Sequence, residues 1–567
     1  MSGDGGGGGG WRDMGSVAVH ILTGRWFMFF SCLLLMSAAG GTYIFGIFSE
    51  EIKTSLGYDQ KTLNLVSFFK EIGANVGIIA GLINEVAPTW LVLLVGAAMN
   101  FSGYFFIWLG VTGRIAHPRV WWICLSICVG ANSQTFVHTG ALVTMVNNFP
   151  ESRGIVIGLL KGYVGLSGAI MTQLYHALYG NDDKSLILLI AWLPAAVSCV
   201  FLGTVRTIKV VRQSNEVKVF YNLLFVSLGL AAVLMAVIIL QNRIAFSRTD
   251  YAVTVSVIIV LVFSPLVVVV KEEVKLWRRS KNPHSHPFTV KTPETKAAPP
   301  LQLQQLQARS NHVWYKNVFT PPERGEDYTI PQAVFSIDML VLFVVTMTGA
   351  GGTLTAMDNL GQIGKSLGYP DRYITTFVSL VSIWGYLGRV VSGFCSEIFL
   401  AKYKFPRPLM LTLVLLLSCS GHLLIAFGVP NSIYAASILI GFCFGALWPL
   451  IFSIISELFG LKHYSTLVSF GGAASPVGSY IFNVRVAGVL YDNEGLKQMA
   501  RKGMSRKAGE DLTCDGVECF KVAFIIIAAA TLGGCILSLI LVARTRKFYR
   551  GDIYKKFREQ AQVEDGP

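Results

Sequence analysis

Long apolar runs, separated by short polar segments, recur along most of the chain. A membrane-spanning helix needs about 20 consecutive, mainly apolar residues. Runs of this kind lie at 26–49, 62–84, 90–110, 120–147, 154–178, 187–206, 220–240, 250–270, 333–358, 373–396, 408–428, 432–457, 465–489 and 520–543. They predict an all-α polytopic membrane protein with about 14 spans, in groups of six, two and six.

Short sequences in the first group of runs return in the last group at a constant distance. Ala-Gly-Gly-Thr occurs at 39–42 and at 350–353, and Ser-Leu-Gly-Tyr occurs at 55–58 and at 366–369. The second copy follows the first by 311 residues in both cases. Many secondary transporters are built from such repeats, with the substrate site at the interface between the halves. The repeat therefore predicts two six-helix bundles, with the two middle runs inserted between them as a hairpin.

The repeat and the composition together divide the chain into six predicted segments. These are a disordered Gly-rich tail (1–25), an N-terminal six-helix bundle (26–206), an inserted helical hairpin (207–270), a flexible cytoplasmic linker (271–332), a C-terminal six-helix bundle (333–543) and a basic cytoplasmic tail (544–567). Lysine and arginine beside the runs favour cytoplasmic N- and C-termini. The segment 491–519 is also basic and would face the exterior, but a loop of that length carries less weight.

Composition supports the same class. Hydrophobic residues make up 53% of the chain and charged residues 14%, whereas a soluble domain carries about 25% charged residues. The net charge of +14 lies largely beside the apolar runs, so it predicts cytoplasmic flanks and not nucleic-acid binding. Because no nucleotide fingerprint, metal-spaced cluster or nucleophile elbow is present, we expect a non-enzyme without cofactor or metal. The expected partners are the lipid bilayer, at the plasma membrane or an endomembrane, and a small solute.

A glycine followed four residues later by a glutamate ends the second run of each half. Gly81 precedes Glu85, and Gly393 precedes Glu397; Gly388 and Arg389 stand just before the second copy. The pattern resembles the gate motif of the major facilitator superfamily, in which glycine permits close helix approach and the carboxylate pairs across the cytoplasmic gate. The first copy lacks the basic residues that usually follow. Two copies at equivalent positions predict the major facilitator fold.

Further segments resemble the plant nodulin-like family, the branch with nuclear-fusion-defective-type proteins. They are Gly24-Arg-Trp26, the run Ala39-Gly-Gly-Thr-Tyr-Ile-Phe-Gly46, Asn147-Asn-Phe-Pro-Glu-Ser-Arg-Gly154 and Cys514-x-Gly-x-x-Cys519-Phe520. The resemblance covers nearly the whole chain outside the tail and linker. It implies a facilitator-type membrane protein of plants, more distantly similar to monocarboxylate and oxalate porters.

Ionisable residues inside the predicted spans are the candidate substrate and coupling residues. An ionisable group at membrane depth costs about 2.5–3.5 kcal/mol, so it should face a cavity or a partner. The candidates are Lys161, Glu71, Lys70, His138, Arg485 and Asp358. In the functional interpretation Lys161 binds an anion and Glu71 carries a proton; in the structural one they pair with other groups or reach the membrane surface. Adjacent residues point about 100° apart on a helix, so Lys70 and Glu71 are not expected to pair directly.

Two of these candidates have specific alternatives. His138 could carry a proton near neutral pH or be a neutral packing residue. Asp358 could line the outer cavity or cap its helix. Arg389 and Glu397 are expected to act at the gate and not to bind substrate. Cys514 and Cys519 lie in a loop assigned to the exterior or lumen, where thiols oxidise, so they are predicted to form a disulfide.

The primary hypothesis is a secondary-active transporter that moves a small solute by alternating access. The solute would be an organic anion, with coupling to protons. The alternative is a non-transporting membrane sensor or scaffold that keeps the fold and signals through the cytoplasmic linker. Uptake into proteoliposomes separates the two hypotheses, because a scaffold carries no flux.

Overall fold

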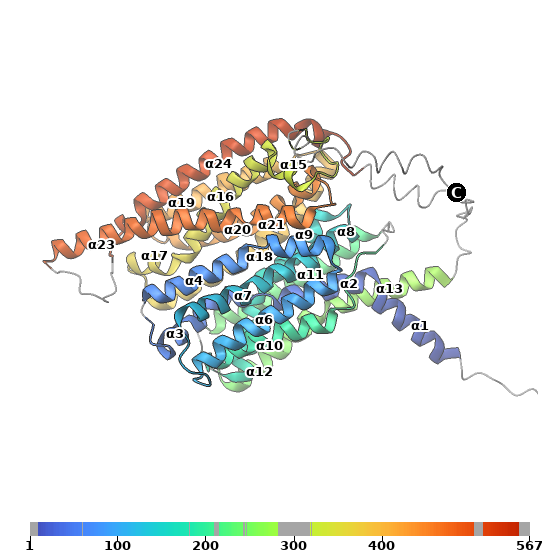
Figure 1. The fold of residues 1–567 in the computed structure, drawn as a ribbon, viewed down its shortest axis with the longest axis horizontal. Helices are drawn as coiled ribbons and strands as arrows, with labels where there is room; N and C mark the ends of the chain where they lie inside the picture. Colours follow the sequence, from blue (N-terminus) through green and yellow to red (C-terminus); the bar gives the residue numbers. More distant parts are fainter. Residues whose placement is uncertain are drawn as a thin grey trace, which may run out of the picture.

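A computed structural model shows the chain as a bundle of long helices that run roughly side by side (Figure 1). It describes residues 9–281 and 318–554, except 59, 181, 209–214, 242, 243, 245, 319 and 504–513. Within the described residues, 11 helices are long and apolar enough to cross a membrane, or up to 12 if one bent pair counts as a span. The predicted all-α, multi-span architecture is confirmed in this form, with fewer continuous spans than the apolar runs predicted.

Two of the apolar runs are broken into shorter helices. The run 26–49 divides after α2 (Arg25–Ala38) at Gly40 and Gly41, and continues as a short 3₁₀ turn and α3 (Phe45–Ser55). The run 465–489 divides into α21 (Tyr464–Gly472), α22 (Ala474–Ser479) and the π-helical stretch η6 (Tyr480–Gly488). Glycine lowers helix stability by about 1 kcal/mol relative to alanine, so paired glycines are natural break points.

The N-terminal half contains the elements up to α10. They are α1 (Gly9–Thr23), α2, η1 (Gly41–Ile44), α3, α4 (Gln60–Asn75), α5 (Ile78–Val86), α6 (Thr89–Val111), α7 (Val120–His138), η2 (Thr139–Val143), α8 (Thr144–Asn148), α9 (Arg153–Tyr179) and α10 (Asp183–Phe201). Helix α7 packs against α4 and α6, and α9 packs against α2. Helix α9 is the most buried candidate span of this half, which places it at the centre of the molecule.

The C-terminal half repeats this arrangement. It contains α15 (Ile330–Val334), α16 (Ile337–Asp358), α17 (Leu360–Ser366), α18 (Asp371–Tyr403), α19 (Arg407–Phe427), α20 (Ser432–Leu458), α21 (Tyr464–Gly472), α22 (Ala474–Ser479), η6 (Tyr480–Gly488), α23 (Val489–Arg501) and α24 (Glu518–Arg550). Helix α18 packs against α20 on one side and α9 on the other. The pair of α9 and α18 therefore joins the two halves.

Three helices lie between the halves in the sequence: α11 (Glu216–Gln241), α12 (Arg248–Phe263) and α13 (Pro265–Lys281). Glu216 at the start of α11 accepts a hydrogen bond from Arg25 at 2.9 Å, and Glu273 of α13 accepts one from the backbone of Trp26 at 2.9 Å. Helices α11 and α12 pack on α9, and α11 also contacts α18. The hydrogen bonds of Glu216 and Glu273 thus connect α11 and α13 to the N-terminal half at one end of the bundle.

Three predicted irregular segments are in part helical. Helix α1 covers most of the predicted disordered tail, because Val17, His20 and Ile21 form one partly buried face and α1 packs on α13 and α2. Helix α13 continues to Lys281, so 271–281 is not flexible linker. Helix α24 runs to Arg550 and takes in the start of the predicted tail. Most of the linker, 282–317, and the residues after 554 lie outside the described part.

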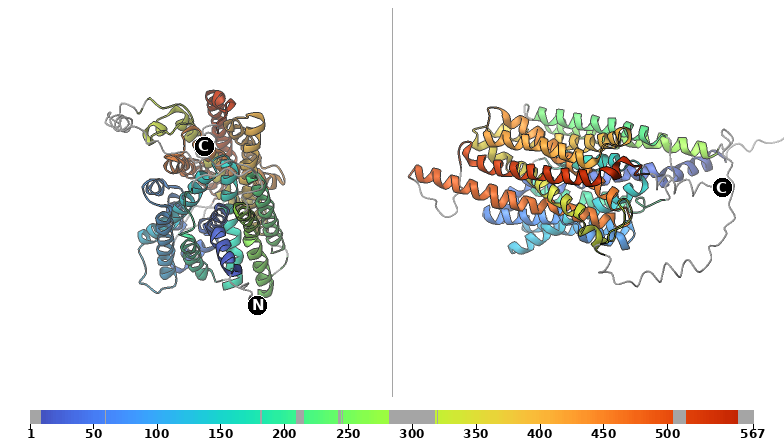
Figure 2. Two further views of the ribbon diagram at one scale, coloured as in Figure 1. Left: turned by 90° about the vertical axis from the view of Figure 1, so that its right-hand side faces the viewer. Right: turned by 90° about the horizontal axis from the view of Figure 1, so that it is seen from above.

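The two ends of the bundle differ. Helices α1 and α13 project from one end, called here the terminal end, and α23 projects from the other, called the distal end (Figures 1 and 2). The predicted loop at 491–519 begins as a helix, since α23 extends through Arg501.

Candidate functional site

A cavity of about 280 Å³ lies between the two halves. Its walls come from η1, α4, α7, η2 and α9 of the N-terminal half and from α16, α17, α18, α20, α21 and α22 of the C-terminal half. None of its described lining residues belongs to α11, α12 or α13. The position between the halves is where the sequence repeat predicted a substrate site.

Lys161 and His138 meet in this cavity. Lys161 comes from α9 and His138 from the last turn of α7, and Lys161 Nζ lies 3.4 Å from His138 Nδ1. The ammonium also faces the ring of Phe452, 4.9 Å from its centroid. Within the described residues Lys161 forms no ion pair with a carboxylate. A cation is therefore held in the cavity by a histidine nitrogen and an aromatic face.

Arg389 also lines the cavity, although the sequence pattern predicted a gate residue. Its guanidinium carbon lies 5.7 Å from the centroid of the Phe444 ring, and 4% of the residue is exposed. Helix α18 continues for more than three turns beyond Arg389 to Tyr403, so the gate end of the helix lies further along. We refer to Lys161, His138 and Arg389 as the donor tier.

Glu71 and Asp358 lie in the part of the cavity nearer the distal end, and are called here the acidic tier. Glu71 Oε1 lies 2.6 Å from Lys70 Nζ, so the expectation that these neighbours do not pair is wrong. Their Cα–Cβ bonds diverge, but both side chains are long enough to curve together. Asp358 comes from α16 of the other half and accepts a hydrogen bond from Asn483 at 3.3 Å.

Arg485 is not among the cavity residues. It lies in η6 and is exposed, and it is absent from the cavity lining. The broken helix explains this position: the π-helical stretch changes the direction in which successive side chains point.

The first copy of the gate motif joins the two halves at the terminal end. Glu85 Oε2 lies 2.7 Å from His463 Nδ1, and Glu85 Oε1 accepts a hydrogen bond from Thr466. A β-carbon on Gly81 would lie 2.8 Å from the Cα of Thr466, so only glycine allows α5 to approach α21 this closely. His463 of the other half takes the place of the basic residues that usually follow the glutamate of the gate motif.

The second copy joins α18 to α9. Glu397 Oε2 accepts a hydrogen bond from the backbone N–H of Gly154 at 3.0 Å and pairs with Arg407 at 2.8 Å. A β-carbon on Gly393 would lie 2.8 Å from the Cα of Gly158, so glycines on both helices allow the contact. Gly388 instead faces the Phe442 carbonyl of α20 and packs α18 within its own half.

Glu397 lies in a cluster of buried charged residues that was not predicted from the sequence. Arg407, which is fully buried, lies 2.7 Å from Glu457. The hydroxyl of Tyr554 lies 3.0 Å from Glu397 and 3.1 Å from Glu457. Burial raises the pKa of the Tyr554 phenol well above its usual value, so the hydroxyl keeps its proton and donates it. In the sequence, the charged residues of this cluster stand at the ends of apolar runs. Charged residues are expected there as flanks of membrane spans, so they did not indicate a cluster.

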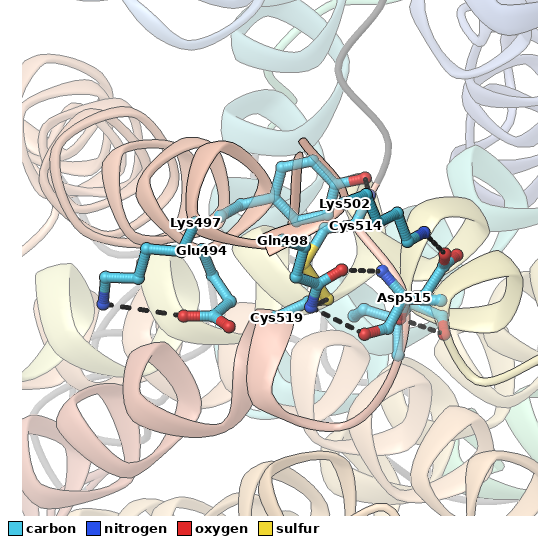
Figure 3. Close-up of a disulfide and its surroundings, with 10 residues drawn as sticks. Glu494, Lys497, Gln498, Lys502, Cys514, Asp515 and Cys519 are labelled. Carbon is cyan, nitrogen blue, oxygen red and sulfur yellow. Dashed lines mark hydrogen bonds and ion pairs between the residues drawn. A yellow bond between two sulfur atoms is a disulfide. The ribbon is translucent and has the colours of Figure 1, made fainter. Parts of the chain in front are cut away.

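The distal end carries a disulfide between Cys514 and Cys519 (Figure 3). The Cys514 backbone N–H donates to the Tyr491 hydroxyl at 3.2 Å. Gln498 of α23 forms two hydrogen bonds with the backbone of Asp515, at 2.8 and 2.9 Å (Figure 3). The disulfide links the segment before α24 to the first turn of α24, and the hydrogen bonds of Tyr491 and Gln498 hold this segment against α23.

We expect Cys514 and Cys519 to be linked in protein taken from intact membranes, because the distal end would face an oxidising compartment. Alkylation before digestion, followed by mass spectrometry, should recover them in one disulfide-linked peptide. The same protein treated first with reductant is the control and should show both thiols alkylated. Alkylation of both cysteines without reductant would contradict the disulfide and the orientation of the chain.

The chain matches two known protein families. Residues 25–270 match the family described as Nodulin-like, and residues 326–551 match the one described as NFD4, C-terminal domain. The protein NUCLEAR FUSION DEFECTIVE 4 of Arabidopsis thaliana is 22% identical over 550 residues, which cover 93% of this chain and 89% of that protein. A "Probable transporter MCH1" of Wickerhamomyces anomalus is 20% identical over 468 residues, covering 82% of this chain and 78% of that protein.

The fold is similar to that of a solved major facilitator structure. The proton:xylose symporter XylE matches with a TM-score of 0.53 and 11% identity, over 90% of this chain and 94% of that chain. This likeness concerns the fold alone, and it confirms the predicted major facilitator architecture.

Proposed function

Because the chain belongs to the nodulin-like family, with a Nodulin-like domain followed by an NFD4 C-terminal domain, we propose that it is a secondary-active transporter that moves a small organic anion across a membrane by alternating access. The observation that carries the proposal is the cavity between the halves, with a lysine and an arginine in its walls. Placing a cation at membrane depth costs free energy, which favours a functional role for the lysine and the arginine. Relatives named as transporters support the same class.

Alternating access requires a gate that closes one side of the cavity at a time. The contacts of Glu85 with His463 and of Gly154 with Glu397 join the halves at the terminal end. We propose that this end is cytoplasmic, as the basic flanks suggest, and that the structure represents a state closed to the cytoplasm. We further propose 14 spans, with α11 to α13 as an accessory hairpin outside the transport core.

Proton coupling is assigned to Glu71. It lies in the cavity between the donor tier and the distal end, and faces the acidic tier's second carboxylate, Asp358, from the opposite half. Protonation of Glu71 would remove a negative charge that repels an anion entering the cavity from the distal end. The cost of moving an anion past two carboxylates would then depend on pH.

We expect Glu71→Gln to uncouple uptake from the proton gradient. If one proton moves with each solute, a gradient of one pH unit, acidic outside, supports about tenfold accumulation in the unmodified protein. The variant cannot change its charge and should show no accumulation. Uptake into proteoliposomes with and without a pH gradient measures this, with Glu518→Gln on the exposed surface as control. An unchanged response to the gradient would remove Glu71 from the coupling mechanism.

The experiment for the proposed function is uptake by the purified full-length protein in proteoliposomes. We expect saturable uptake of at least one labelled organic anion, above that of protein-free vesicles. The alternative, a sensor or scaffold that signals through the linker, predicts no flux for any solute.

A further inference from the structure

We propose that one side of α13, at the point where this helix leaves the membrane, binds an anionic phospholipid. The surface lies outside the cavity between the halves and does not depend on which solute the protein carries. It is a groove of about 790 Å³, called here the α13 groove. Its described lining is made of four apolar and four basic side chains of α13: Leu266, Val267, Val270, Val274, Lys271, Lys275, Arg278 and Arg279.

The first step is the position of the groove relative to the bilayer. Helices α12 and α13 together form one candidate span, and α13 projects from the terminal end (Figure 1). Residues 251–270 contain no charged side chain, and about 20 apolar residues are enough to cross the hydrocarbon core. The apolar residues of the groove stand at 266–274 and the basic ones at 271–279. The groove therefore crosses the boundary between the hydrocarbon core and the headgroup layer.

The second step is that the groove is open to a ligand. Val267 is 65% exposed, and Lys271, Arg278 and Arg279 are exposed as well. Another side of α13 faces the protein, where Glu273 is only 2% exposed. An open face that is apolar toward the membrane and basic beyond it suits a molecule with acyl chains and an anionic headgroup.

The third step is the charge of the groove itself. Within the part of the chain that the structure describes, no ion pair involves Lys271, Arg278 or Arg279. The fourth basic residue, Lys275, lies 3.5 Å from Glu272. Three exposed cations on one side of the helix thus lack a carboxylate partner among the described residues.

The fourth step is the location of the other carboxylates near α13. Glu273 accepts a hydrogen bond from the backbone N–H of Trp26 at 2.9 Å. On α11, Glu216 pairs with Arg25 at 2.9 Å. On α12, Asp250 caps its own helix at the distal end. The described carboxylates of the helices packed on α13 are therefore engaged elsewhere, and an anionic headgroup supplies the counter-charge.

The fifth step is whether the basic side chains reach the headgroups. Arg278 lies seven residues beyond Lys271, which is about 10 Å along the helix, and the headgroup layer is about 5–7 Å thick on each side of the bilayer. Side chains of a helix tilt toward its N-terminus, which for α13 is the membrane side. Long basic side chains also lay their stems along apolar surface and keep the charged group in the polar layer. Arg278 can therefore reach back to a phosphate.

A phospholipid matches the whole groove better than a soluble anion does. Clusters of basic residues directly beyond a membrane helix attract anionic lipids, and the fork of arginine fits a phosphate with two parallel hydrogen bonds. A soluble phosphate would contact only the basic half of the groove. The acyl chains of a lipid would also cover its row of valines.

The test compares palmitoyl-oleoyl phosphatidylserine with palmitoyl-oleoyl phosphatidylcholine, which have the same acyl chains but differ in headgroup charge. The purified full-length protein in detergent receives both lipids in equal amounts, and native mass spectrometry identifies the first lipid bound. One basic residue near an anionic surface contributes about fivefold in affinity. We therefore expect the unmodified protein to prefer phosphatidylserine by at least about tenfold, and the triple variant Lys271→Gln/Arg278→Gln/Arg279→Gln to prefer it by about twofold or less.

The matched control removes three exposed basic residues of α24 at the same end of the molecule: Arg546→Gln, Lys547→Gln and Arg550→Gln. This variant loses the same net charge and should keep most of the preference for phosphatidylserine. An equal loss in the two triple variants would show a general attraction to the basic end and would overturn the α13 groove as a site.

Three other outcomes also decide. Absence of any preference for phosphatidylserine in the unmodified protein overturns the proposal. Displacement of the lipid by an equal concentration of glycerophosphoserine, which has no acyl chains, shows that a soluble phosphate is sufficient and overturns the lipid as the occupant. If the triple variant elutes as misfolded protein in size-exclusion chromatography, the double variant Arg278→Gln/Arg279→Gln takes its place: a reduced preference there supports the site, and an unchanged preference overturns it.

Discussion

Lys161→Ala is expected to abolish solute uptake while the protein still folds and inserts. The substitution removes the ammonium that faces the cavity from α9. Hydrogen bonds to charged groups contribute about 1.5–3 kcal/mol, which corresponds to a loss of about 10- to 150-fold in affinity for an anion. The remaining cavity would keep Arg389 but would lack the ammonium beside His138. Initial uptake rates at low solute concentration in proteoliposomes measure this loss.

Two controls make the result interpretable. Arg485→Ala removes an exposed cation outside the cavity and should transport normally. Lys161→Arg keeps the charge but brings a larger, planar group, and we expect it to restore little activity beside His138. Normal transport by Lys161→Ala would refute the anion site. The same conclusion would follow if Lys161 were found paired with Glu71 in every conformational state.

Arg407→Met is expected to cause the largest loss of stability. Arg407 is fully buried and pairs with both Glu397, at 2.8 Å, and Glu457, at 2.7 Å. Removing one partner of a buried ion pair typically costs about 3–5 kcal/mol, because the other charge is left without compensation. Here two carboxylates would lose their common cation. The midpoint of thermal unfolding of the purified protein measures the effect.

A surface pair provides the comparison for this prediction. Lys521 and Glu518 lie 2.8 Å apart at the surface, where Glu518 is exposed and Lys521 is partly exposed, so Lys521→Met should cost no more than about 1 kcal/mol. Adding Glu397→Gln and Glu457→Gln to Arg407→Met should recover part of the lost stability, since the two buried carboxylates that lost Arg407 are then uncharged. If Arg407→Met and Lys521→Met unfold at the same temperature as the unmodified protein, the cluster does not stabilise the fold.

Two repeats at a distance of 311 residues, Ala-Gly-Gly-Thr and Ser-Leu-Gly-Tyr, predicted the two halves, and a cavity lies between them. A duplicated set of hydrophobic runs predicts a duplicated helical bundle, and both the duplication and the runs can be recognised in the sequence alone. Lys161 could also be selected from the sequence, since a lysine within an apolar run has few structural explanations. Its partner His138, 23 residues earlier, could be considered only as a separate candidate.

Some contacts that the sequence did not predict join residues of different halves. Arg153 donates to the Ser456 carbonyl, 303 positions away, and Gly154 donates to Glu397, 243 positions away. No local pattern encodes such a contact. The motif around Arg389 was assigned to the gate as a whole, but a helix rises 1.5 Å per residue. Arg389 and Glu397, eight residues apart, therefore lie at different depths, one in the cavity and the other at the gate.

The central claim is that this chain carries a small organic anion through the cavity between its halves. Uptake of labelled succinate into proteoliposomes, with the unmodified protein and Lys161→Ala side by side, tests it most directly. The account predicts saturable uptake by the unmodified protein and, for the variant, uptake at the level of protein-free vesicles. Folded, membrane-inserted protein that carries no succinate or any other organic anion would contradict it.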